Sequence, residues 1–178
     1  VALALANLKL RETLRNQSVG DPLTGLFNRR YMEETLDREL RRATRGRTPV
    51  GVIVLDIDHF KRFNDTFGHG AGDLILRELG VLLRSQIRGE DVACRYGGEE
   101  FVLILPGREA ARLQVNYSGQ PLGQITVSLG VAVFPAHGLA PAALLSAADA
   151  ALYRAKRQGR NQAVLAQAEP PTDAPSPG

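Results

Sequence analysis

Acidic residues occur at two places in the sequence that could meet in the folded chain. Asp56 and Asp58 end an apolar run, and side chains two apart on a strand face the same way. Glu99 and Glu100 follow a Gly-Gly pair that is typical of a hairpin turn. If that hairpin packs beside the first strand, its turn brings Glu99 next to Asp56. Carboxylates with a free backbone carbonyl suit Mg²⁺ and metal-assisted phosphoryl transfer, whereas the simpler interpretation is a set of strand-end carboxylates in water.

Three basic residues could add an anion site to these carboxylates. Lys61 lies five residues after Asp56, and Lys156 and Arg160 lie four apart near the end of a predicted helix. Cations at this spacing share a helical face and could hold one phosphate group. The alternative is that they only complement the negative end of the helix dipole.

The glycine-rich segment 68–72 (GHGAG) invites comparison with phosphate-binding loops. It does not directly follow a predicted strand, and no Gly-Lys-Ser/Thr follows it, which excludes both the Walker and the dinucleotide-binding motifs. Glycines at the start of a helix can instead let a flat ring approach the backbone closely.

The hydrophobic pattern predicts the α+β elements that must position these residues. Continuous or alternating apolar runs predict strands, and apolar residues three or four apart predict amphipathic helices. The expected strands are 50–55, 92–96, 100–105, 125–134 and 163–165, and the expected helices are 29–45, 73–88, a short one over 108–115, and one from 141 that ends at Gly159. From residue 50 the first six elements follow the ferredoxin-like βαββαβ plan, with an added helix and strand.

Length and composition restrict the class of protein. The 178 residues suffice for one domain, which we place at 21–166, between a linker helix at 1–20 and a disordered proline-rich tail at 167–178. The linker helix could be the end of a coiled coil from an upstream domain, or a solvated helix leaning on the domain. A net charge of +3 does not indicate a nucleic-acid partner.

Two further features of the composition bear on the protein's surroundings. No apolar run reaches the roughly 18 residues that a membrane helix needs, so we expect no span in this chain. The single cysteine, Cys94, fits a reducing compartment and argues against a Cys/His zinc site. We therefore expect the chain to be cytoplasmic, or the cytoplasmic part of a larger protein.

Taken together, the motifs resemble those of the GGDEF family, the diguanylate cyclases. The resemblance covers about residues 21–165, and the matching blocks are 21–29 (DPLTGLFNR), 56–73 (DIDHFK through ND to GHGAGD), 95–101 (RYGGEEF), 127–130 (VSLG) and 151–161 (ALYRAK through GRN). The naming motif is present in its GGEEF form. The family has a fold like that of nucleotidyl cyclases and polymerase palms.

The resemblance implies a reaction and a set of roles. Two domains, each with one GTP, meet as a homodimer under the control of an upstream sensor domain and form cyclic di-GMP and two pyrophosphates. Mg²⁺, or Mn²⁺, is bound by Asp56, the Ile57 carbonyl and Glu99, and Glu99 or Glu100 removes the hydroxyl proton. The remaining substrate-binding residues are Lys61, Lys156 and Arg160 for phosphate, Asn64 and Asp73 for guanine, and Phe60 beside them. Asp58 and Asp65 are assigned either a supporting role behind the site residues or a structural role.

The resemblance also implies a regulatory site. Arg88 and Asp91 match the family's RxxD inhibitory site, where cyclic di-GMP would lock two domains in a pairing that keeps the two GTPs from meeting. The plainer interpretation is a charged helix end followed by a turn. Two other functions stay open: a GGDEF domain that binds cyclic di-GMP without turnover, and a nucleotidyl cyclase or polymerase-like enzyme with other chemistry. The segment 107–124 departs from the family, whose members normally have a much longer helix there. The sequence at this point either contains a true deletion or omits a disordered stretch.

Overall fold

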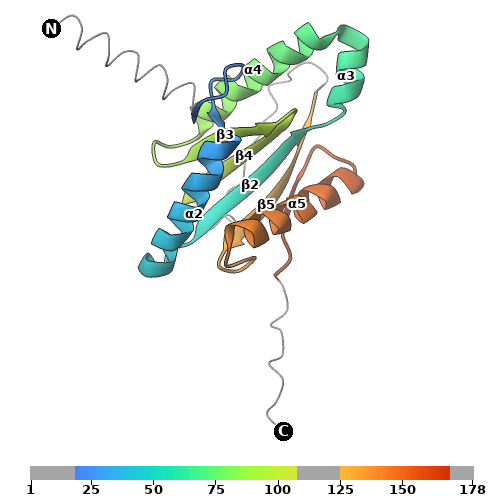
Figure 1. Cartoon of the computed structure of the whole chain (residues 1–178). Helices are drawn as coiled ribbons and strands as arrows, with labels where there is room; N and C mark the ends of the chain where they lie inside the picture. Colours follow the sequence, from blue (N-terminus) through green and yellow to red (C-terminus); the bar gives the residue numbers. More distant parts are fainter. Residues whose placement is uncertain (1–18, 108–124, 169–178) are drawn as a thin grey trace, which may run out of the picture.

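A mixed six-stranded sheet forms the centre of the molecule in the computed structural model, which describes residues 19–107 and 125–168 (Figure 1). The strands lie in the order β1-β3-β4-β2-β5-β6. Their bounds are β1 Phe27–Asn28, β2 Val50–Ile57, β3 Val92–Gly97, β4 Glu100–Pro106, β5 Val127–Phe134 and β6 Ala163–Leu165. The helices are α2 Arg29–Gly46, α3 Phe60–Phe67, α4 His69–Gln86 and α5 Pro141–Arg157.

Strand β2 lies at the centre because both its faces are apolar. All eight of its residues are buried. It pairs antiparallel with β4 on one side, with Val50 opposite Pro106, and with β5 on the other, with Val50 opposite Phe134. A strand covered on both faces is expected to be a continuous apolar run, and the VGVIVL sequence has that form.

Helices cover both faces of the sheet. On one face, Val52 and Val54 of β2 belong to a core cluster that contains Met32 of α2 and Leu144 of α5. On the other face, Ile53, Leu55 and Ile57 belong to a cluster with residues from α3 and α4. The alternation of side chains along β2 therefore divides its residues between two cores.

The predicted fold class is confirmed, with one error in the helices. Strands β3-β4-β2-β5 have the ferredoxin-like order, and β1 and β6 extend the two edges by parallel pairing. The helix predicted over 73–88 begins earlier, at His69, and is preceded by the unpredicted helix α3. Gly68, with φ of 84°, separates the two helices, and an eight-residue helix is too short to show a clear apolar period.

Several other expectations fall on residues that are not described. The linker helix over 1–20 lies almost entirely within 1–18, and the short helix over 108–115 lies within 108–124. The proposed domain boundaries stay predictions. Within the described residues, no helix combines the length and apolar character needed to cross a membrane.

Local features of the sequence match the structure elsewhere. Asn28 caps α2, since its side chain accepts a hydrogen bond from the Tyr31 N–H at 3.0 Å. Cys94 is fully buried, and burial raises the pKa of its thiol to about 12. It is thus the small buried hydrophobe that its setting in β3 predicts.

Gly130 of β5 permits a close contact between the sheet and α5. A Cβ at this position would overlap the Ala148 carbonyl oxygen and the Leu152 backbone nitrogen, which belong to the helix backbone and cannot move independently. The absence of a side chain at Gly130 therefore sets the distance of α5 from β5.

We predict that Gly130→Ala lowers the free energy of unfolding by at least about 2 kcal/mol, because the helix must shift outward. Gly70→Ala, where an added Cβ meets nothing within 4 Å, should leave stability nearly unchanged. Urea unfolding monitored by circular dichroism measures both changes. Equal stability of the two variants would contradict this account of α5 packing.

Candidate active site

The pairing of β2 with β4 places the acidic turn beside the end of the central strand. Asp56 lies opposite Glu100 in the register. The Ile57 N–H donates a hydrogen bond to the Glu99 carbonyl oxygen at 3.4 Å, which extends the pairing into the turn. The structure thus brings together Asp56, Ile57, Glu99 and Glu100, as the sequence predicted.

Lys156 of α5 completes this acidic site with a positive charge. Its Nζ lies 2.9 Å from Asp56 Oδ1, and Asp56 is only 6% exposed. Both residues are predicted site residues, but their ion pair is not predictable from the sequence, because it joins positions 100 residues apart (156 minus 56). The contact shows that the C-terminal end of α5 lies next to the end of β2 that carries Asp56.

Burial and mutual repulsion disfavour the charged carboxylates at this site. Burial raises the pKa of Asp56; the hydrogen bond and charge of Lys156 oppose that rise, and Glu99 and Asp58 add to it. Burial also raises the pKa of Glu100, with further contributions from Asp56 and Asp149. A site with this excess of negative charge favours a bound cation.

The donor set fits a magnesium ion. Asp56, the Ile57 carbonyl and Glu99 provide only oxygen, and Mg²⁺ commonly uses one or two carboxylates while keeping waters and taking phosphate oxygens. Among the residues that the structure describes, no three acidic, His or Cys side chains already form a metal cluster. The arrangement therefore suits a weakly held ion completed by a substrate better than a closed structural site.

Arg95 of β3 holds the turn that carries Glu99. Its Nε and Nη2 donate to the Gly98 carbonyl oxygen at 3.0 and 2.8 Å, and its Nη1 donates to Asp21 Oδ2 at 3.4 Å. The Asp21 carboxylate is itself fixed by Thr24, whose N–H and hydroxyl both donate to Oδ1 at 2.8 Å. This role of Arg95 was not predicted, since its spacing to Gly98 does not reveal a side chain that folds back on its own hairpin.

Helices α3 and α4 meet in a tight corner next to the acidic site. Phe60 is buried, and the buried Oδ1 of Asn64 has no hydrogen-bond partner in the described structure. A Cβ at Gly72 would overlap that oxygen and lie 3.1 Å from the Phe60 ring. The half-exposed Asp73 follows directly, on the first turns of α4. Because Gly72 has no side chain, Asn64 can reach the start of α4, where its Oδ1 could accept a hydrogen bond from a ligand.

Two of the predicted phosphate-binding residues are exposed. Lys61 extends from α3, and Arg160 lies beyond the end of α5. The prediction that Lys156 and Arg160 share a helical face is wrong, because α5 ends at Arg157 and Arg160 has a φ of 63°. Gly159 interrupts the helix between them, as its predicted role as a helix stop implies.

Arg88 and Asp91 form a closed turn between α4 and β3. Asp91 Oδ2 accepts from the Arg88 N–H at 2.9 Å, and the Asp91 N–H donates to the Arg88 carbonyl at 3.1 Å. Asp91 is buried, whereas Arg88 is exposed. The turn therefore fixes the carboxylate and leaves the arginine side chain at the surface.

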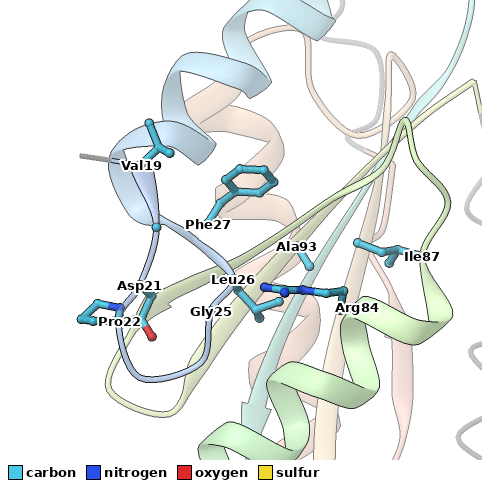
Figure 2. A pocket seen from close by; sticks show the side chains of 10 residues that line it. Val19, Asp21, Pro22, Gly25, Leu26, Phe27, Arg84, Ile87 and Ala93 are labelled. Atoms are coloured by element: carbon cyan, nitrogen blue, oxygen red, sulfur yellow. The ribbon is translucent and has the colours of Figure 1, made fainter. Parts of the chain in front are cut away.

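A hollow of about 830 Å³ lies between the 20–27 turn, the end of α4 and β3 (Figure 2). Figure 2 shows Arg84 extending from α4 toward the loop that carries Gly25 and Leu26. Ile87, which precedes Arg88, also lines it. The hollow thus borders the Arg88–Asp91 turn and is separate from the acidic site.

The fold and this site define a class of α+β domain with an acidic site where a central strand meets a hairpin turn. The family model described as "Diguanylate cyclase, GGDEF domain" matches residues 18–162. The chain belongs to the GGDEF family.

Curated relatives and solved structures agree with that assignment. The response regulator PleD of Caulobacter vibrioides is 46% identical over 162 residues, which is 83% of this chain and 36% of PleD. The diguanylate cyclase DgcP of Pseudomonas aeruginosa is 42% identical over 169 residues, which is 87% of this chain and 25% of DgcP. This chain thus spans well under half of these relatives' length.

Two solved structures show the same fold. The coiled coil and GGDEF domain of DgcB from Caulobacter crescentus, in complex with c-di-GMP, has a TM-score of 0.82 and 34% identity, and the match covers 93% of this chain and 94% of that one. The active GGEEF domain of a diguanylate cyclase from Vibrio cholerae has a TM-score of 0.72 and 32% identity, with 81% and 99% covered.

We predict that Arg95→Ala lowers the free energy of unfolding by about 1–3 kcal/mol, since charge-assisted hydrogen bonds to Gly98 and Asp21 are lost. The amide protons of the 98–100 turn should exchange faster with solvent, which hydrogen-exchange mass spectrometry measures. Arg41→Ala is the matched control, because Arg41 pairs with Asp37 on the exposed face of α2. Unchanged exchange at the turn in Arg95→Ala would show that other contacts hold it.

Proposed function

We propose that this domain is a diguanylate cyclase, which condenses two GTP molecules into cyclic di-GMP and two pyrophosphates. The alignment of the Glu99 turn with Asp56 at the end of β2 carries the proposal. It provides carboxylates for a cation and for proton transfer within one small site. The family membership and the diguanylate cyclases among its relatives support this activity.

The acidic residues have two roles at the reacting centre, which are cation binding and proton transfer. Asp56, the Ile57 carbonyl and Glu99 would hold Mg²⁺, or Mn²⁺, which neutralises phosphate charge when bound. Each GTP 3′-oxygen attacks the α-phosphorus of the other GTP, the bond from that phosphorus to the bridging oxygen breaks, and pyrophosphate leaves. Glu99 or Glu100 accepts the 3′-hydroxyl proton. We favour Glu99, and the raised pKa of Glu100 makes that residue the alternative base.

The basic residues bind the departing phosphates. Lys156 already lies at the acidic site, and Lys61 and Arg160 are exposed cations from the flanking helix and turn. Because pyrophosphate leaves with a large negative charge, cations fixed around it stabilise the transition state more than the bound substrate.

The corner between α3 and α4 provides a base-recognition site. Asn64 Oδ1 is a buried acceptor that no donor of the described residues reaches, and Asp73, next to Gly72, offers a carboxylate. Guanine presents an N1–H and an amino group to such acceptors, and adenine has neither donor in that arrangement. Burying unpaired acceptors against adenine is costly, so this corner favours GTP over ATP. Phe60 would form part of its apolar wall.

The reaction requires two copies of the domain. Each site binds one GTP, so the two sites must face each other in a homodimer. An upstream domain in a longer protein would set that geometry through the segment preceding residue 21. We expect this catalytic unit to act in the cytoplasm, where GTP is available.

The Arg88–Asp91 turn is the proposed inhibitory site for cyclic di-GMP. The exposed Arg88 guanidinium can bind a phosphate or guanine in forked geometry, and the fixed Asp91 carboxylate can accept from guanine. DgcB is one relative whose structure contains c-di-GMP. The same surface would serve the alternative function, a GGDEF domain that binds cyclic di-GMP without turnover.

We expect the purified chain, incubated with GTP and Mg²⁺, to form cyclic di-GMP detectable by mass spectrometry. The double variant Glu99→Ala, Glu100→Ala should lose activity by at least about 100-fold, because proton transfer and cation binding are both removed. Glu34→Ala, on the exposed face of α2, is the control and should retain activity. Absence of product together with tight cyclic di-GMP binding would favour the receptor function instead.

We predict that Arg88→Ala raises the cyclic di-GMP concentration needed for half-inhibition by about tenfold or more, since a charge-assisted contact is lost. The initial rate without product should stay near that of the parent. Arg77→Ala, an exposed arginine of α4, should behave as the parent in both respects. Unchanged inhibition in Arg88→Ala would remove the inhibitory role from this turn.

A further inference from the structure

The chain makes an unusual turn directly after α5. Gly159, Arg160 and Asn161 have φ angles of 116°, 63° and 48°, three consecutive residues in the positive range. Non-glycine residues seldom adopt this conformation because the Cβ approaches the backbone. Such strain persists only where surrounding contacts hold it, and it is concentrated at functional sites.

A buried carboxylate holds this turn. Asp58 is 4% exposed, and its Oδ2 accepts from the Asn161 N–H at 3.1 Å. The same oxygen accepts from the Thr126 hydroxyl at 2.7 Å, and Oδ1 accepts from the Ser128 hydroxyl at 2.7 Å. Asp58 thus links the end of β2, the start of β5 and the turn after α5.

Backbone contacts fix both sides of the same turn. The Arg160 N–H donates to the Ala155 carbonyl at 3.0 Å, and the Leu129 N–H donates to the Gln162 carbonyl at 2.9 Å. The first bond ties the turn to α5, and the second ties the residue that follows the turn to β5. The contact with Asp58 ties the turn to the third element, next to the acidic site.

Asp58 holds the turn at the end of the sheet where the acidic site lies. Asp58 is two residues after Asp56, and Lys156, the penultimate residue of α5, contacts Asp56. The turn held by Asp58 consequently carries the exposed Arg160 at the same end of the sheet as the carboxylates and Lys156. A fixed backbone limits the positions that the guanidinium can reach, so less conformational entropy is lost when it binds an anion.

We propose that Asp58 is a positioning residue that, through the Asn161 N–H, holds the left-handed 159–161 turn so that Arg160 binds the terminal phosphates of the nucleotide. This inference rests on the proposed function, which supplies the nucleotide. Asp58 itself does not contact the nucleotide in this account. Its effect on binding is exerted only through the turn.

A pair of substitutions at the exposed Asn161 tests the link without altering the core. Asn161→Pro removes the backbone N–H and forces a negative φ, so it breaks the contact with Asp58. Asn161→Gly keeps the N–H and accepts the positive φ. The probe is 3′-deoxy-GTP with Mg²⁺, which has the triphosphate but lacks the attacking hydroxyl, and its binding is measured by calorimetry. GMP, which lacks the terminal phosphates, is the reference ligand.

We expect Arg160→Ala and Asn161→Pro each to weaken 3′-deoxy-GTP binding by about tenfold, the loss typical of one charge-assisted hydrogen bond, with GMP binding unchanged. Asn161→Gly should bind like the parent. The double variant Arg160→Ala, Asn161→Pro should be no weaker than Arg160→Ala alone, because both changes remove one interaction. Asp58→Ala should behave like Asn161→Pro, and Asp58→Asn, which keeps an acceptor oxygen, should restore binding.

The outcomes separate this inference from the function on which it rests. If the parent does not bind 3′-deoxy-GTP, the proposed function fails and the inference fails with it. If Arg160→Ala weakens binding but Asn161→Pro and Asp58→Ala do not, only the positioning role is overturned. Equal weakening of 3′-deoxy-GTP and GMP by Asn161→Pro would likewise overturn it, because a general structural defect would then explain the loss. Thermal unfolding of each variant confirms that the folded protein is being compared.

Discussion

The antiparallel pairing of β2 with β4 is the constraint on which the site depends. A shift of one residue in that register would move Glu100 away from Asp56 and reverse the faces of every β4 side chain. The register is protected because β4 is packed on both faces: Val102 and Ile104 belong to one core cluster and Phe101 and Leu103 to the other, so a slip would exchange side chains between the two cores. The stability of the core and the geometry of the acidic site therefore have the same origin.

Electrostatics explains why the site is built at the edge of this core. Asp56 and Asp58 are both buried, which carries a large cost in free energy unless each carboxylate is compensated. Asp58 is compensated by protein donors from β5 and the 159–161 turn, whereas Asp56 pairs with the Lys156 cation and is repelled by Glu99. The structure thus separates one satisfied carboxylate, which organises the chain, from another that can still bind a cation.

Most of the fold and much of the site could be predicted from the sequence, because both depend on local patterns. The continuous apolar run of β2 and the Gly-Gly turn were sufficient to place Glu99 near Asp56. The unpredicted features need knowledge of distant contacts: the Lys156–Asp56 pair, the Arg95 clamp on Gly98, and the binding of Asn161 by Asp58. Helix α3 was missed since eight residues show little periodicity, and Arg160 was misplaced because a left-handed turn leaves no pattern of spacing.

Paramagnetic broadening by Mn²⁺ tests most directly whether a cation binds where β2 meets the hairpin turn. Amide signals of residues 56–58 and 98–100 should broaden first when Mn²⁺ is added with 3′-deoxy-GTP. The same titration of Asp56→Asn should leave those signals sharp at equal Mn²⁺ concentration. Broadening centred elsewhere on the domain, or equal broadening in the Asp56→Asn variant, would contradict the assignment of this site.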